Sequence, residues 1–116
     1  MLERIYKYCL AKAGATESFP FDENTLVLKV GKIFAMISLE KNPLRMNLKC
    51  DPERAVELRE TYDSVLPGYH CNKQHWNTLV LDNSIPDDLV FELIDHSYDL
   101  IVASLSKKQK EALGWQ

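Results

Sequence analysis

One alternating stretch in the first third of the chain limits the possible folds most. Apolar side chains at every second position from Leu26 to Val30 are typical of a strand whose two faces meet different surroundings. Gly31 interrupts this run, and the β-prone stretch from Ile33 to Leu39 resumes it. The pattern predicts a β-hairpin that turns at Gly31, and therefore an antiparallel sheet.

Two further strands are predicted from the same alternation. After a turn at Asn42 and Pro43, the stretch from Arg45 to Cys50 places polar and apolar side chains on opposite faces. The stretch from His75 to Leu81 is also typical of a strand, and the turn residues after it close the element.

Helical patterns separate and flank these strands. Residues 1–13 have the apolar spacing of an amphipathic helix, and Gly14 follows as its expected left-handed cap. Asp51 before Pro52 predicts the start of a second helix, which ends near Asp63.

The last third of the chain is predicted to be helical. Ser84 and Asp87 have the spacing of a capping box, which predicts the start of a long helix with an inward-facing apolar stripe. The residues from Ser106 onward favour a short cationic helix containing Lys107 and Lys108.

The order of these elements predicts a single α+β domain over residues 1–116. We expect an antiparallel sheet of about five strands with helices packed on one face. The other face would be available to a ligand, and strand alternation allows a polar group to share it: Lys29, Arg45, Asn47 and Lys49.

Composition limits the cellular location and the kinds of partner that we expect. A hydrophobic content of 46% with 27% charged residues is ordinary for a globular domain, and the longest apolar run, Ile33 to Ile37, is too short to span a bilayer. The three cysteines form no CxxC pair, which favours reduced thiols, a cytoplasmic location and no metal centre. We therefore expect no membrane association and no cofactor.

Charge is unevenly distributed along a chain whose net charge is −3. Residues 1–50 hold eight basic and five acidic residues, a balance of +3, whereas residues 83–103 hold five acidic residues and no Lys or Arg. This asymmetry permits one basic face on an acidic protein, and equally permits solvated faces of opposite sign.

The densest cluster of polar and aromatic side chains spans residues 69–77. Four interpretations compete there: loop and sheet structure, nucleic-acid contact, a peptide or partner-protein surface, and metal binding. Lys73 suits a phosphate, the amides suit base edges, and Trp76 suits stacking on an unpaired base. The metal interpretation lacks a second ligand pair at conventional spacing, although His70 and His75 lie five residues apart.

No catalytic centre is predicted. His96 lies between Asp95 and Asp99 at helical spacing, which is more typical of a polar helix stripe than of a general base. The four glycines form neither a GxGxxG motif nor a phosphate-binding loop. We therefore expect a non-enzymatic protein.

Five separated motifs resemble the MmcQ/YjbR family and cover nearly the whole chain. They are Glu17-Ser18-Phe19-Pro20-Phe21, Lys29-Val30-Gly31-Lys32-Ile33-Phe34-Ala35, Leu48-Lys49-Cys50-Asp51-Pro52, Tyr69-His70-Cys71-Asn72-Lys73-Gln74-His75-Trp76-Asn77 and His96-Ser97-Tyr98-Asp99-Leu100. The resemblance implies a small bacterial protein with a double-wing sheet, similar in fold to frataxin-type domains and secretion chaperones, and it implies DNA binding. It points to Lys49 and the 70–77 motif as the site, with His96, Ser97 and Tyr98 as a second patch.

The residues and the resemblance together predict DNA binding through the exposed sheet face and the turn from Tyr69 to Asn77. The alternative is a protein- or peptide-interaction module that uses the same surface. We expect a monomer or weak dimer. The residues expected to contact nucleic acid are Lys29, Lys49, His70, Asn72, Lys73, His75, Trp76 and Asn77.

Overall fold

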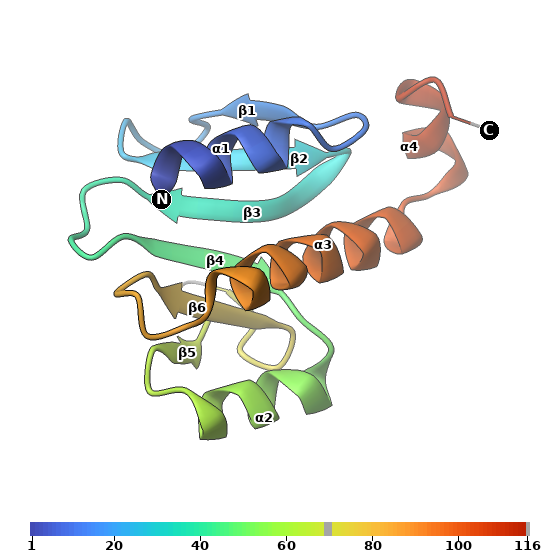
Figure 1. Cartoon of the computed structure of the whole chain (residues 1–116). Coiled ribbons are helices and arrows are strands. Elements are labelled where there is room, and N and C mark those ends of the chain that lie inside the picture. The colour runs from blue at the N-terminus through green and yellow to red at the C-terminus, as the bar shows by residue number, and fades with distance from the viewer. Residues whose placement is uncertain (69–70, 116) are drawn as a thin grey trace.

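A computed structural model describes residues 1–68 and 71–115. Tyr69, His70 and Gln116 lie outside the described residues. Within the described ranges the chain forms four helices and one six-stranded sheet (Figure 1). The helices are α1 (Leu2–Leu10), α2 (Pro52–Thr61), α3 (Asp87–Ser104) and α4 (Lys107–Ala112). The strands are β1 (Thr16–Ser18), β2 (Thr25–Val30), β3 (Lys32–Ser38), β4 (Arg45–Lys49), β5 (Val65–Pro67) and β6 (Trp76–Val80).

The sheet is antiparallel throughout, with the strand order β1-β2-β3-β4-β6-β5. The predicted α+β class and antiparallel sheet are confirmed. The two edge strands, β1 and β5, were not predicted because each has only three residues and no alternating apolar pattern.

The first hairpin turns at Gly31, as predicted. Gly31 has φ +75°, a backbone conformation that glycine adopts without steric cost, and it joins β2 directly to β3. A bulge between Leu28 and Lys29 shifts the register from Leu28↔Ala35 to Lys29↔Ile33. The extra residue is Phe34, so the alternation is broken in β3, where Phe34 and Ala35 are both fully buried, while Leu26, Leu28 and Val30 of β2 all belong to the core.

The helices cover one face of the sheet, which confirms the predicted layering. Figure 1 shows α1 and α3 crossing in front of the strands, with α2 beside β5 and β6. The core lies between these layers and contains Ile5 of α1, Phe34 of β3 and Ile94 of α3, each with no exposed surface. The Tyr98 ring meets the Phe34 ring edge-on, with centroids 5.4 Å apart.

The helix ends follow the predicted signals in part. Asp51 caps α2 by accepting a hydrogen bond from the Arg54 amide at 3.2 Å, with Pro52 at the first helical position. The predicted capping box at Ser84 is wrong, because α3 begins after Pro86 without a side-chain cap. The Ser84 hydroxyl instead bonds the Asp82 carboxylate at 2.6 Å, in the turn before the helix.

The two remaining helix ends also differ from expectation in detail. Helix α1 ends at Leu10, and Gly14, with φ +73°, lies in the turn that follows. Helix α4 begins with a capping box between Ser106 and Gln109. In the described part of the chain, no helix combines the length and the apolar character needed to cross a membrane.

Candidate nucleic-acid interface

The sheet face without helices carries the polar side chains of β4. Met46 and Leu48 belong to the core beneath the helices, so the alternating residues of the same strand lie on the opposite face. Of these, Arg45 is exposed, whereas Asn47 and Lys49 are half-buried. The predicted sharing of one face by the three β4 residues is confirmed.

This helix-free face is not a bare surface. The Asn47 carbonyl oxygen accepts a hydrogen bond from the Thr78 hydroxyl at 2.6 Å, across the β4–β6 pair. The Asn47 amide also donates to the Cys71 sulfur at 3.6 Å, which brings the loop before β6 over this face. Val27 is fully buried although it lies outside the main core cluster. The polar groups of the helix-free face are therefore partly engaged in hydrogen bonds within the protein, and recognition of a ligand must rely on side chains at the edges of this face.

The described segment before β6, residues 71–75, is held by an arginine of α2. Arg59 donates from Nη1 to the Lys73 carbonyl at 3.1 Å and to the Asn77 side-chain carbonyl at 2.8 Å. The Asn77 amide donates in turn to the Ala55 carbonyl at 3.3 Å. One guanidinium thus anchors both the loop and the start of β6 to the helical layer.

Asn77 is therefore placed differently from what a contact residue requires. It is only 1% exposed and points toward the helices, where Arg59 and the backbone of α2 satisfy its polar atoms. Trp76, one residue earlier, lies on the opposite face with Thr78, because successive strand residues alternate. Asn77 is removed from the set of side chains available to a ligand.

The turn before β6 holds its own backbone in place and leaves its side chains outside. The Asn72 side-chain oxygen accepts from the Gln74 amide at 2.9 Å, and the Asn72 carbonyl accepts from the His75 amide at 3.2 Å. The His75 carbonyl accepts from the Cys50 amide at 2.8 Å, which ties the turn to the end of β4. Asn72, Lys73 and Gln74 are exposed, while His75 is half-buried.

The position of Trp76 depends on a close backbone approach. Gly68 donates its amide to the Trp76 carbonyl at 2.9 Å, and a Cβ at position 68 would lie 2.7 Å from the Trp76 Cβ. No larger residue fits at position 68 without moving the strand. Trp76 itself is half-buried and pairs with Lys49 across the β4–β6 ladder.

The side chains of the second patch implied by the resemblance are engaged in hydrogen bonds within the fold: Ser97 is buried, whereas His96 and Tyr98 are half-buried. The Ser97 hydroxyl, on a residue with no exposed surface, accepts from the Lys49 amide at 2.9 Å and donates to the Phe34 carbonyl at 2.6 Å. His96 Nε2 accepts from the Asp51 amide at 3.1 Å, and the Tyr98 hydroxyl donates to the Ala13 carbonyl at 2.6 Å. These bonds hold α3 against the sheet and α1, so the three residues build the fold.

The cations of the expected site gather toward one end of the sheet. Lys29 ends β2, Lys49 ends β4 and Lys73 precedes β6, and antiparallel pairing brings these strand ends to the same side. Arg45 lies at the other end of β4, about 13 Å away at the rise of an extended strand. In the part of the chain that the structure describes, no acidic group lies within ion-pair distance of the three lysines.

Sequence reasoning missed Arg59, although a signal was present. Arg59 lies four residues after Ala55 and next to Leu58, on the stripe of α2 that faces inward. An arginine on an apolar helix stripe must find acceptors, and here it finds two.

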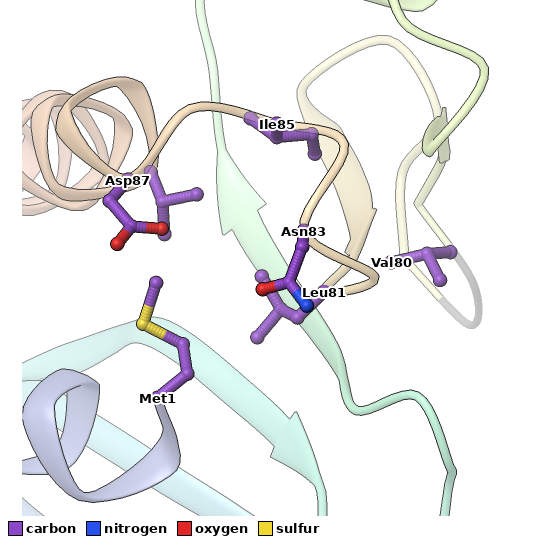
Figure 2. A pocket seen from close by; sticks show the side chains of 7 residues that line it. Met1, Val80, Leu81, Asn83, Ile85 and Asp87 are labelled. Carbon is purple, nitrogen blue, oxygen red and sulfur yellow. The ribbon is translucent and has the colours of Figure 1, made fainter.

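The hollows found in the molecule are small. One, at the start of α3, is lined by Met1, Leu81, Asn83 and Asp87 among others, and has room for about one water molecule (Figure 2). Another of similar size lies beneath the candidate site, where Lys49 and Asn77 line it together with Leu48 and other core residues. Among the described residues, no group of three His, Cys, Asp or Glu side chains is arranged to hold a metal ion.

Comparison with known proteins places the whole chain in one group. A family model described as YjbR matches residues 10–100. The uncharacterized protein YjbR of Escherichia coli (strain K12) is 36% identical over 113 residues, covering 97% of this chain and 96% of that protein. The uncharacterized protein YyaQ of Bacillus subtilis (strain 168) is 42% identical over 55 residues, covering 47% of this chain and 46% of that protein.

The solved structures agree with the sequence comparisons. A crystal structure of a Deinococcus radiodurans protein with the family-model domain DUF419 has a TM-score of 0.91 and 38% identity, and it covers all of this chain and 89% of that one. A Pseudomonas syringae protein at 22% identity shares the fold, with a TM-score of 0.73 over 85% of this chain and 97% of its own. Sequence, fold and motif order all lead to the same conclusion: the chain belongs to the YjbR family.

Proposed function

We propose that this protein binds DNA without catalysing a reaction, through the helix-free sheet face and the turn before β6. One observation carries the proposal: Lys29, Lys49 and Lys73 lie at one end of the sheet, and no described acidic group lies within ion-pair distance of them. Unpaired ammonium groups near a fixed backbone turn are suited to phosphate contacts, which supply most sequence-independent affinity.

The neighbouring side chains add contacts of other kinds. Gln74 is exposed on the same turn, and its amide suits sugar or base-edge hydrogen bonds. Trp76 lies beside Lys49 on the sheet face and offers a partly exposed ring for stacking on an unpaired base. Asn72 and His75 frame the turn, and His70 remains a proposed contact outside the described residues.

The overall charge sets the expected strength. A net charge of −3 repels a polyanion except at the end of the sheet that carries Lys29, Lys49 and Lys73, so binding should be modest and strongly dependent on salt. A cytoplasmic location is part of the proposal, and the three free cysteines favour a reducing compartment. A monomer or weak dimer presents this surface without covering it.

The test is a titration of fluorescently labelled duplex DNA at several salt concentrations. Phosphate contacts by three lysines should contribute about −3 to the slope of log affinity against log salt. Lys49→Ala and Lys73→Ala should each weaken binding and make the slope less steep by about 1. Lys41→Ala is the matched control, because Lys41 is also exposed but follows β3 at the opposite end of the sheet. Absence of binding at low salt, or equal effects of all three substitutions, would reject the proposal.

A second candidate function is capture of a peptide or partner protein on the same face. It is favoured by apolar side chains on the same face as Trp76, since Met36, Leu66 and Val80 lie farther along the strands and are half-buried, not fully covered. In a pull-down from nuclease-treated lysate, Trp76→Ala should abolish capture and Lys73→Ala should leave it unchanged. If the ligand is DNA, Lys73→Ala should instead weaken binding.

A further inference from the structure

The C-terminal segment is fastened to the hairpin end of the sheet. Lys32, the first residue of β3, donates from its ammonium group to the Ser104 carbonyl at 3.1 Å, at the last residue of α3. A Cβ at position 31 would lie 3.0 Å from Cδ2 of Leu105, and one at position 14 would lie 3.0 Å from the Trp115 ring. The first hairpin and the chain end are therefore in close contact, and Figure 1 shows α4 beyond the C-terminal end of α3.

This contact places lysines that are far apart in the sequence at the same end of the molecule. Lys107 and Lys108, in the first turn of α4, are exposed, and Lys110 is half-buried. Lys29 and Lys32 are exposed on the hairpin. Glu111 adds one negative charge to α4, so the five lysines and this acid sum to +4. We call these five lysines the basic end.

The basic end continues the row of cations in the proposed DNA interface. The last residues of β2 and β4 and the first residue of β6 lie at the same end of the sheet. Neighbouring strands are spaced by about 4.8 Å. From β2 to β6 the row therefore extends over about 14 Å before α4 adds to it. In the described ranges, no lysine of the basic end forms an ion pair with an acidic side chain.

The apolar residues of the same segment do not suit a membrane surface. An interfacial helix needs an exposed apolar side, and the large apolar side chains that are exposed in the described chain are Met1, Phe19, Phe21 and Val56. Leu113 and Trp115, at the end of α4, are instead half-buried against the region of Gly14 and Gly31. The exposed character of α4 is cationic and polar.

We propose that the basic end is a second phosphate-binding surface, which extends the DNA interface from the sheet face onto helix α4. This inference rests on the proposed function, because it assigns further phosphates to the same ligand. Lys107, Lys108 and Lys110 contact the DNA backbone without reading bases, and the hairpin fixes their position relative to Lys49 and Lys73.

The experiment compares two triple variants with the same net charge. The first is Lys107→Gln with Lys108→Gln and Lys110→Gln, and the matched control is Arg4→Gln with Lys7→Gln and Lys41→Gln, all exposed cations away from the basic end. The titrated ligand is the labelled duplex used above. Loss of three phosphate contacts should make the slope of log affinity against log salt less steep by about 2.7. Between 50 and 200 mM salt, the factor by which affinity falls should therefore be about 40 times smaller for the variant than for the wild type. The control should change the slope by less than about one third of that amount.

The outcomes separate this inference from the proposed function. If the wild type binds and Lys73→Ala weakens it, but the α4 variant behaves like the control, the inference is overturned and the proposed function stands. If the wild type does not bind duplex DNA at all, the proposed function fails first. Binding of α4 to vesicles containing phosphatidylserine, without duplex binding, would overturn the inference in favour of a lipid surface. Thermal melting of both variants checks that each remains folded.

Discussion

Cations that join another helix or its following turn to α3 are paired with acids, whereas, among the described residues, the lysines at the end of the sheet are not. Lys12 of the turn after α1 forms an ion pair with Asp95 of α3, and its ammonium group lies 4.8 Å from the centre of the Tyr8 ring. Arg54 of α2 pairs with Glu92 of α3 in the same way. Lys29, Lys49 and Lys73 have no such partner among the described residues. Acids on α3 therefore neutralise the cations that join helices, whereas in the described ranges the sheet-end lysines have no acidic side chain within ion-pair distance.

The paired cluster is also the place where acid–base properties change. Burial alone would raise the pKa of Asp95, but hydrogen bonds from Lys12 and Tyr8, with the Lys12 charge, lower it overall. The hydrogen bond to Asp95 raises the pKa of Tyr8, and burial adds to that effect. The helical side therefore uses charge to join α1 to α3.

The largest expected effect concerns a residue that sequence reasoning assigned to recognition. Asn77→Ala removes the acceptor of Arg59 and leaves a partly buried guanidinium without one partner. We expect a loss of about 2–3 kcal/mol in the free energy of unfolding, measured by urea titration. Asn72→Ala, in the exposed turn, is the matched control and should cost less than about 1 kcal/mol. Equal stability of the two variants, with weaker DNA binding by Asn77→Ala, would restore Asn77 as a contact residue.

A smaller effect is expected for the interior hydroxyl that joins α3 to the sheet. Ser97→Ala removes bonds to the Lys49 amide and the Phe34 carbonyl and should cost about 1–2 kcal/mol of unfolding free energy. Lys49→Ala changes only the side chain and should cost less than about 0.5 kcal/mol, while it weakens DNA binding. A Ser97→Ala variant as stable as the wild type would contradict the structural role assigned here.

The smallest effect is the pH dependence of the paired cluster. The folded pKa of Asp95 lies below its ordinary value of 3.8, so its contribution is present above that pH and is lost as the pH falls through the folded pKa. Lys12 and Tyr8 have raised pKa values, so their contributions are present below about pH 10 and are lost as the pH rises further. The Lys12 and Asp95 side chains are 24% and 40% exposed, which limits the effect to about 1 kcal/mol or less.

The measurement for that effect is the urea midpoint of the wild type and of Lys12→Met from pH 2 to pH 11. The difference between the two should be largest near neutral pH and should shrink at both extremes. Asp82, whose pKa the Ser64 and Ser84 hydrogen bonds lower to about 2, adds an acid dependence that both proteins share. A difference that stays constant with pH would show that Lys12 stabilises the fold through packing alone.

Much of the fold could be predicted because its main elements have clear periodicity. The hairpin at Gly31, the start of α2 at Asp51 and the inward stripe of α3 all follow from local patterns. The edge strands could not be predicted, because three residues are too few to show alternation and their pairing is decided by the neighbouring strand. Ser84 had the spacing of a cap, but Asp82 and Ser64 compete for its hydroxyl.

The candidate site was predicted less completely, for a geometric reason. The sequence of the 69–77 motif predicts one continuous surface, yet a strand begins within it, and alternation places Trp76 and Asn77 on opposite faces. That division could have been anticipated from the strand predicted over residues 75–81. The α2 arginine that holds the motif could not be paired with it, because the contact joins elements 14–18 residues apart through a loop.

The strand order has a consequence for how binding can be studied. Strand β6 is inserted between β4 and β5, so the turn carrying Lys73 is held by segments from both halves of the chain. A synthetic peptide copied from this turn lacks those supports and would sample many shapes in solution, at a large entropic cost to any complex. Affinity for a ligand should therefore vanish together with cooperative unfolding, which makes ligand-induced thermal protection a suitable way to screen for partners of the intact protein.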